Sequence, residues 1–284
     1  MIDSIIKSIE RIPAFPATIQ KVTELLRNDD YDVANVANVI KFDQAIAANI
    51  MKISNSAYFG ARQKISSIQD AVVYLGQQQL IRAVQTAGIS KIYGKGGKGY
   101  VAQSKDLWEH SVAVALMSQI LSRKIYSRED HSLYTAALLH DVGKIVMGVY
   151  VNDFFEQIMQ RVKNEKCSFL EAEEEILGIN HADVGGRIAD HWNFPKDIKD
   201  AIAYHHRPDL LREQANKNAW MVYLSDQACL MMGIDGGVDA LAYKGLEDVM
   251  DFFNIRMVDL EKCFIALVSE LESAKDLIHN INMS

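Results

Sequence analysis

A histidine and an aspartate stand side by side in the apolar stretch AALLHDVGKI, residues 136–145. Adjacent residues on a helix point about 100° apart, because one turn takes about 3.6 residues. This geometry suits a site with two ions, in which Asp141 bridges both and His140 binds one. Two-metal hydrolytic sites keep their ions about 3.5–4 Å apart, within reach of such a pair.

Further histidines and acids occur at spacings that would complete such a site. Asp106 and His110 are four residues apart, so a helix places their Cβ atoms about 5–6 Å apart on one face. His205 and His206 repeat the adjacency, with one histidine expected for each ion. Each histidine alone would fit a hydrogen-bonded or surface role, so the spacing leaves both roles open. The candidate metal ligands are Asp106, His110, His140, Asp141, His181, His205, His206 and Asp226.

The candidate donors are five imidazoles and three carboxylates, without a thiolate. This mixture suits iron, manganese, zinc or nickel and disfavours a structural zinc site of the cysteine type. Lys144 follows His140 by one helical turn and is expected to face the same cavity, where a cation would meet a phosphate. We therefore expect two divalent transition-metal ions, with Asp141 and Lys144 as the catalytic residues of any reaction.

Composition limits the class of protein. The chain of 284 residues carries a net charge of −7, which argues against a general nucleic-acid binder. Its three cysteines are far apart and lack metal-site spacing, which is typical of small buried side chains in a reducing compartment. The sequence has neither a signal-peptide pattern nor the about 20 apolar residues that span a bilayer. We expect a cytoplasmic protein without a membrane partner.

Helical periodicity dominates the chain, which predicts an all-α fold. The glycine-rich segment 94–100 matches G-x-G-x-x-G, but it follows a helical pattern and no parallel-sheet pattern surrounds it, so we interpret it as a linker. The expected parts are an N-terminal helical subdomain, 1–99, and a larger helical bundle with extra C-terminal helices, 100–284. Within the bundle we expect one helix over 129–150, and a solvated helix face at the acidic run 171–175.

The order of several motifs resembles the HDOD family, the HD-related output domain of bacterial signalling. The resemblance runs from about Pro13 to about Gly233. Its motifs are IPAFPATIQKVTELL, IKFDQAIAANIMKISNSAYFG, ISSIQDAVVYLGQQQL, LWEHSVAVALMSQIL, AALLHDVGKIV, EEEILGINHADVGGRIADHWNFPKDIKDAIAYHHRP and MVYLSDQACLMMG. It implies an all-helical fold whose second part is related to HD-domain metal-dependent phosphohydrolases. Many HDOD proteins have lost metal ligands and act as non-catalytic signalling modules.

The ligand series of this chain is similar to the full binuclear set of HD-GYP phosphodiesterases. Asp106 stands where those enzymes carry glutamate, and Lys144 matches their phosphate-binding lysine. The acid and Gly-Tyr-Pro loop that follow their double histidine are absent, because the chain reads HHRPDLLREQANKNAW. The absence of this loop removes the main argument for a cyclic dinucleotide as the substrate. Arg207 is either a phosphate contact or an exposed loop residue.

Two functions follow from the sequence and the resemblance. The favoured one is a signalling or adaptor module, whose partner is a signalling protein or a small phosphate-containing ligand. The alternative is an active metal-dependent phosphohydrolase or phosphodiesterase acting on a nucleotide or another phosphoester. Two ions would then lower the pKa of a water molecule and neutralise charge on the phosphoryl group.

Overall fold

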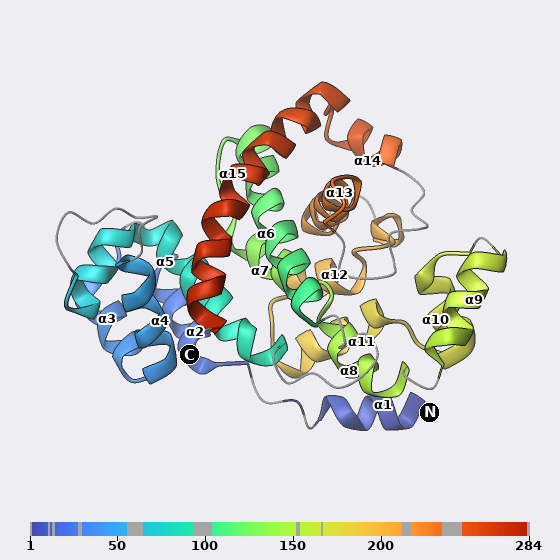
Figure 1. Cartoon of the computed structure of the whole chain (residues 1–284), viewed down its shortest axis with the longest axis horizontal. Helices are drawn as coiled ribbons and strands as arrows, with labels where there is room; N and C mark the ends of the chain where they lie inside the picture. Colours follow the sequence, from blue (N-terminus) through green and yellow to red (C-terminus); the bar gives the residue numbers. More distant parts are fainter. Residues whose placement is uncertain are drawn as a thin grey trace. The chain divides into compact units, whose positions relative to one another are not determined.

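The structure is a computed structural model and describes residues 2–10, 12, 15–27, 30–55, 65–93, 104–151, 154–165, 167–211, 217–234 and 246–282 (Figure 1). These residues form helices and connecting turns without a strand, which confirms the all-α prediction. The glycine-rich segment 94–100 lies outside the described residues. Within the described part of the chain, each helix is too short or too polar to cross a bilayer.

The helices are drawn in chain order in Figure 1. Their bounds are α1 Ile2–Ile9, α2 Ala17–Leu25, α3 Val33–Lys41, α4 Gln44–Ser54, α5 Ile68–Tyr93, α6 Ser104–Tyr126, α7 His131–Leu139, α8 Val142–Val151, α9 Phe155–Glu165, α10 Phe169–Leu177, α11 His181–His191, α12 Lys196–Ala203, the 3₁₀ helix η2 Pro208–Leu210, α13 Lys217–Met231, α14 Leu246–Phe252 and α15 Met257–Asn282. Side-chain caps fix several of the starts. Asp32 and Asp43 accept hydrogen bonds from the first turns of α3 and α4, as their positions before apolar runs predict.

The chain divides into two compact units that are each discontinuous in sequence. One comprises the described parts of 14–92 and 269–284, in which Gln77 of α5 donates to the carbonyl of Leu26 after α2. The other comprises the described parts of 1–13 and 93–268 and contains the candidate ligands whose side chains are described. In that second unit α6 packs on α7 and α13, and α11 packs on α8 and α12.

The expected helix over 129–150 is broken at its centre, which corrects the sequence interpretation. Helix α7 ends at Leu139, His140 is its C-cap, and α8 begins at Val142. His140 and Asp141 therefore occupy a turn between two helices, and the amide of Lys144 donates to the Asp141 carbonyl at 3.0 Å. The break lets both side chains enter the interior, since both residues are about 1% exposed.

Glycines allow α8, α11 and α12 to approach one another closely. A Cβ atom on Gly143 would lie 1.9 Å from the backbone oxygen of His181, and one on Gly186 would lie 2.7 Å from the Cβ of Ala203. Both glycines of the pair 185–186 pack against residues of α12. These approaches bring the start of α8 and the start of α11 together, and each start carries a candidate ligand.

Helix α10 begins with a reciprocal capping box. The Ser168 hydroxyl accepts from the Glu171 amide at 3.2 Å, and the Glu171 carboxylate accepts from the Ser168 amide at 2.7 Å. Both contacts satisfy amides that a helix start leaves without a partner.

We expect Ser168→Ala to lower the free energy of unfolding by about 1 kcal/mol, because it removes the side-chain acceptor of this cap. Equilibrium urea unfolding measures the loss. Glu171→Gln serves as the matched control, since its amide oxygen still accepts from the Ser168 backbone, and it should lose less than Ser168→Ala. Equal stability of Ser168→Ala and the wild type would contradict the role of the cap.

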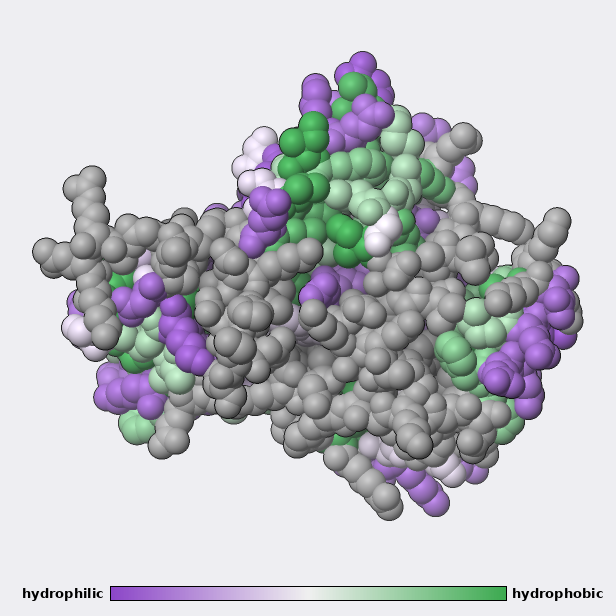
Figure 2. Space-filling view, in the orientation of Figure 1, coloured by the Kyte–Doolittle hydropathy of each residue, from purple (hydrophilic) through white to green (hydrophobic). Residues whose placement is uncertain are grey.

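The surface over α14 and α15 carries exposed apolar side chains between hydrophilic ones (Figure 2). Ile265 is 74% exposed, and Phe252 and Val258 are each more than two-fifths exposed. Single apolar side chains are ordinary on protein surfaces, so we assign no role to this face.

Candidate metal centre

Four imidazole rings are oriented by a contact at Nδ1, on the side of the ring away from the cluster. The Nδ1 atoms of His140 and His205 lie 2.7 Å from the carbonyls of Ala137 and Ile202, and Nδ1 of His110 lies 2.9 Å from the carbonyl of Ile234. A carbonyl only accepts, so each of these nitrogens carries the hydrogen and donates. The fourth ring, His181, makes the equivalent contact to a carboxylate. All four Nε2 atoms therefore point inward, and each carries a lone pair when its ring is neutral.

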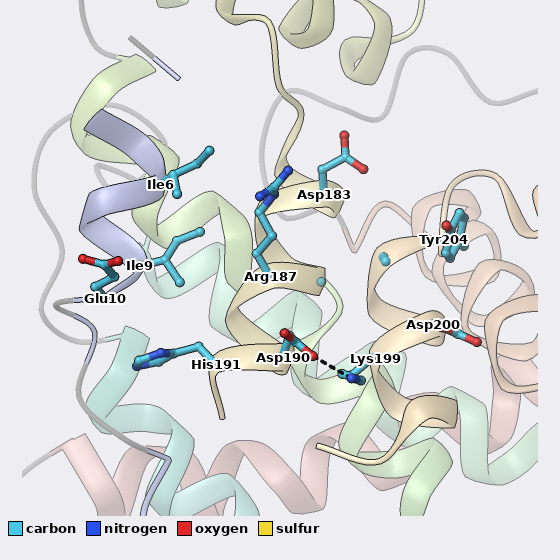
Figure 3. A pocket seen from close by; sticks show the side chains of 12 residues that line it. Ile6, Ile9, Glu10, Asp183, Arg187, Asp190, His191, Lys199, Asp200 and Tyr204 are labelled. Carbon is cyan, nitrogen blue, oxygen red and sulfur yellow. Dashed lines mark hydrogen bonds and ion pairs between the residues drawn. The ribbon is translucent and has the colours of Figure 1, made fainter. Parts of the chain in front are cut away.

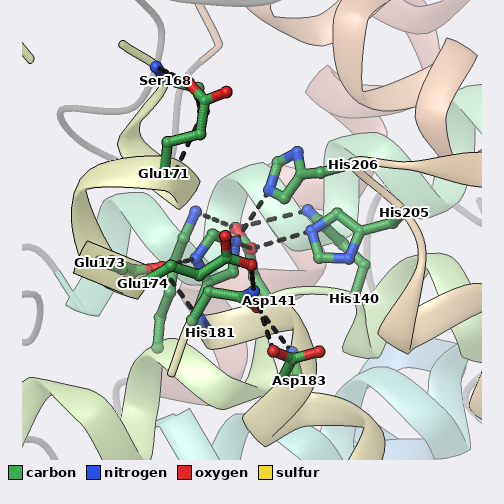
Figure 4. Close-up of polar contacts among 12 residues, drawn as sticks. His140, Asp141, Ser168, Glu171, Glu173, Glu174, His181, Asp183, His205 and His206 are labelled. Atoms are coloured by element: carbon green, nitrogen blue, oxygen red, sulfur yellow. Dashed lines mark hydrogen bonds and ion pairs between the residues drawn. The ribbon is translucent and has the colours of Figure 1, made fainter. Parts of the chain in front are cut away.

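The inward nitrogens converge on two buried carboxylates. Asp141 Oδ1 lies 3.5 Å from Nε2 of His181 and 3.6 Å from Nε2 of His205, and Asp141 Oδ2 lies 3.4 Å from Nε2 of His140. On the other side Nε2 of His110 lies 3.1 Å from Oδ1 of Asp226. Asp141 thus stands between histidines from three different elements (Figure 4).

Two groups of potential metal ligands share Asp141. One group is Asp141, His181, His205 and His206; the other is His110, His140 and Asp141, and in each group the donor atoms lie within 4.8 Å of one another. Asp226 adjoins the second group through His110. The sequence placed one histidine of the 205–206 pair at each ion, whereas the structure brings both into the first group. The pair follows the end of α12 in a turn, and its ring centroids are 4.0 Å apart.

The arrangement fits a cation. Asp141 Oδ1, His205 Nε2 and Asp226 Oδ2 are buried and have no hydrogen-bond partner among the described residues. Nε2 of His110 and Oδ1 of Asp226 are two acceptors facing each other at 3.1 Å, which requires a proton or a metal ion. Buried acceptors that converge in this way are costly without a positive charge beside them.

The protonation preferences of His205, His206 and Asp141 also favour metal binding. Burial lowers the pKa of His205 to about 4, and burial together with His205 and His181 holds the pKa of His206 well below its usual range. Burial alone would lower the pKa of His140, but the carboxylates of Asp141 and Asp226 outweigh it and raise that pKa. Burial likewise opposes ionisation of Asp141, yet Lys144 and His140 keep its pKa well below the usual value. Neutral imidazoles and an ionised carboxylate are the forms that bind metal ions.

Lys144 lies inside the cluster, and Asp106 lies outside what the structure describes. Lys144 is 2% exposed, and its ammonium lies 2.7 Å from Oδ2 of Asp141. Residue 106 belongs to α6, but its side chain is not among the described ones. The described carboxylate next to His110 is Asp226, from α13.

The sequence interpretation missed Glu173. We expected the acidic run 171–175 to be a solvated face, but Glu173 is 0% exposed and binds His181. Its position held a signal, because Phe169, Glu173 and Leu177 are spaced by four and all three are buried on one stripe of α10. A charged residue in an apolar stripe indicates a specific partner.

Arg207 forms an ion pair at the rim of the double-histidine turn. Its guanidinium lies 2.9 Å from Oε2 of Glu174, and the other oxygen of that carboxylate accepts from Asn180 at 2.6 Å. Asn180 in turn caps α11 by accepting from the amide of Asp183. The structure thus places Arg207 in a network that joins the turn after α12 to α10 and to the start of α11.

A groove of about 740 Å³ lies on the other side of α11, against α1 and α12 (Figure 3). Its charged side chains include Arg187 and the ion pair between Asp190 and Lys199, at 2.6 Å. The predicted metal ligands do not line it. Helix α11 therefore contributes to two environments, since His181 faces the cluster whereas Asp183, Arg187 and Asp190 line the groove.

An all-helical fold with a buried cluster of histidines and aspartates defines a class of candidate metal-binding helical proteins. The model of the HDOD domain family matches residues 12–208 of the chain. The chain therefore belongs to the HDOD family.

Known proteins with this fold come from several bacteria. An HDOD domain protein of unknown function from Geobacter sulfurreducens is 26% identical, with a TM-score of 0.72 over 99% of this chain and 97% of that one. A candidate phosphohydrolase from Shewanella amazonensis SB2B is 22% identical, with a TM-score of 0.68 over 96% and 97% of the two chains. A candidate signal-transduction protein from Marinobacter aquaeolei VT8 is 20% identical, with a TM-score of 0.74 over 99% and 64%. The last two likenesses concern the fold.

An uncharacterised protein from Treponema pallidum (strain Nichols) is 24% identical over 216 residues, which is 72% of this chain. The match covers 39% of that relative, so this chain spans about two-fifths of its length.

Proposed function

We propose that this chain is a signalling module of the HDOD family that binds divalent transition-metal ions at the Asp141 cluster. One observation carries the proposal: four imidazoles donate outward through Nδ1 and aim their Nε2 lone pairs at two buried carboxylates. Asp141 would bridge two ions, one held with His181, His205 and His206 and the other with His110, His140 and Asp226. Nitrogen and oxygen donors without a thiolate suit iron, manganese, nickel or zinc.

Burial of the ligands supports a signalling role over turnover. His110, His140, Asp141, His181 and Asp226 are each at most 2% exposed. Ions held by groups that are assembled only in the folded chain stabilise that fold, because the unfolded chain lacks the site. The proposed output is therefore recognition of a signalling partner by the metal-stabilised helical fold. The Marinobacter aquaeolei neighbour is a candidate signal-transduction protein, in line with this role.

Lys144 favours a second function, hydrolysis of a phosphoester. Its ammonium lies beside the bridging carboxylate, where it could hold a non-bridging phosphate oxygen. Metal ions bound at the cluster would neutralise the charge of the phosphoryl group. The Shewanella amazonensis neighbour is named as a candidate phosphohydrolase, in line with this alternative.

Metal analysis and a phosphoesterase screen separate these functions. After reconstitution with Fe²⁺, Mn²⁺, Ni²⁺ or Zn²⁺, we expect about two ions per chain, and fewer than about one would contradict the ligand assignment. The loaded protein is then assayed on nucleotides and simple phosphodiesters beside Lys144→Met, which keeps the side-chain length without the charge. The signalling role predicts no turnover by either protein. Hydrolysis by the wild type that falls at least about tenfold in Lys144→Met would establish the enzyme instead.

A further inference from the structure

Glu173 is a buried carboxylate that accepts hydrogen bonds from the backbone amide and from the ring of His181. Its Oε2 lies 2.6 Å from Nδ1 of His181 and 3.0 Å from the backbone nitrogen of the same residue (Figure 4). Glu173 is 0% exposed and His181 is 1% exposed. An ionised carboxylate in the interior is costly unless charged or hydrogen-bonding groups compensate it. The contact is therefore a specific feature of the fold.

The contact determines which nitrogen of His181 faces the cluster. The carboxylate accepts from Nδ1, so Nδ1 carries the hydrogen and Nε2 keeps its lone pair. That Nε2 atom lies 3.5 Å from Oδ1 of Asp141 and 2.8 Å from Nε2 of His206. The backbone amide of His181 donates to the same oxygen of Glu173 and so holds that oxygen in place beside the ring. Rotation of the ring would break the hydrogen bond from Nδ1 to this oxygen.

His181 differs from its neighbours in the charge of this outer partner. The rings of His140 and His205 donate to neutral backbone carbonyls, whereas His181 donates to a carboxylate. A carboxylate acceptor raises the basicity of the opposite ring nitrogen and so strengthens it as a ligand. Of these three rings, His181 is the one that donates to a side chain. Substitution of that side chain can therefore change how strongly His181 binds a metal ion.

We propose that Glu173 is a positioning residue, which holds His181 in the Nδ1–H tautomer and strengthens its Nε2 atom as a metal ligand. The strengthening rests on the proposed metal-binding function. The tautomer does not, since it follows from the hydrogen bond alone.

Metal affinity, measured by competition with a chelator, tests the strengthening. Removal of a partner behind a metal-bound histidine costs about 10–100-fold in affinity, so we expect such a loss for Glu173→Ala. Glu173→Gln keeps an acceptor oxygen but loses the charge, and it should fall between Glu173→Ala and the wild type. Glu175→Gln changes an exposed residue of the same helix that pairs with Arg161, and it should bind metal like the wild type. Affinities of both Glu173 variants equal to that of Glu175→Gln would overturn the proposal.

Nitrogen NMR of the metal-free, ¹⁵N-histidine-labelled chain tests the tautomer. We expect His181 to carry its hydrogen on Nδ1 in the wild type and in Glu173→Gln, with the Nε2–H form appearing in Glu173→Ala. An unchanged tautomer in Glu173→Ala, with metal bound normally by the wild type, would overturn the positioning role and leave the metal site standing. If Glu173→Ala shifts the tautomer but the wild type binds no metal, the positioning role stands and only the proposed metal-binding function is contradicted. If Glu173→Ala does not fold, the affinity of Glu173→Gln decides.

Discussion

Asp141→Asn is expected to abolish metal binding at both halves of the cluster. Asp141 is the member common to the two ligand groups, and its two oxygens face different histidines. An asparagine presents one oxygen and one NH₂ group, and the NH₂ group cannot bind a cation. Metal content measured after reconstitution should therefore fall from about two ions per chain to none, where loss of a single ligand of one ion would leave the other bound.

The same substitution also removes the counter-charge of Lys144. The ammonium lies 2.7 Å from Oδ2 of Asp141 in a buried environment, and breaking a buried ion pair from one side costs about 3–5 kcal/mol. Lower stability of the metal-free variant could therefore be mistaken for the cause of metal loss. The double variant Asp141→Asn/Lys144→Met removes the buried charge and should regain part of that stability.

Two comparisons make the result decisive. The double variant should remain free of metal although it folds, because its ligand is still missing. Asp190→Asn makes the same chemical change at an exposed aspartate of α11 that pairs with Lys199, and it should bind metal like the wild type. Full metal content in a folded Asp141→Asn protein would refute the bridging role.

Gly143→Ala is expected to destabilise the chain by about 3 kcal/mol or more. The new Cβ would lie 1.9 Å from the carbonyl oxygen of His181 and 2.8 Å from the amide nitrogen of Gly185. Both neighbours are backbone atoms, so no rotamer change relieves the contact and the helices α8 and α11 must separate. The separation moves Asp141 away from His181, and we expect weakened metal binding as well.

Gly185→Ala provides the matched comparison on the same helix contact. Its nearest obstacle is Cγ2 of Ile202 at 2.9 Å, a buried side-chain methyl group and not a backbone atom, and the next atom is 3.6 Å away. The helix propensity of alanine offsets part of the crowding, so we expect a smaller loss of stability than for Gly143→Ala. Urea unfolding of both variants measures the difference, and equal losses would show that the backbone contact at residue 143 does not control this packing.

Most of the candidate ligands lie where helices begin or end. Five candidate ligands come from the ends of helices and the turns between them: His140 and Asp141 from the α7–α8 turn, His181 from the start of α11, and the histidine pair from the turn after α12. His110 and Asp226 lie within α6 and α13. Backbone carbonyls are free of helix hydrogen bonds at helix ends, and two of them orient imidazole rings. The ends of the helices thus supply most of the ligands and two of the carbonyl groups that orient them.

Much of this protein could be predicted from the sequence because the relevant signals are local. Helical periodicity predicted the helices. The caps at Asp32, Asp43 and Ser168 are also local signals, since a cap and its amides lie within three residues of each other. The motif order predicted the HDOD family, which the family match confirms. The approach of Lys144 to Asp141 also follows from a spacing of three residues.

Contacts between distant segments were decided only by the tertiary structure. Spacing could not show that Asp226 of α13 faces His110 of α6, because these residues are 116 positions apart and meet through helix packing. Nor could it show that a turn breaks the helix at His140, since close packing against α11 governs the path of the chain there.

The burial of Glu173 is the clearest case. The local sequence shows three consecutive acids, which fit a solvated face, and only the packing of α10 against α11 places the first of them against His181. The sequence by itself therefore identifies the residue types that can bind a metal ion. Their orientation, protonation and outer partners depend on the fold, because burial and the positions of distant backbone groups set them.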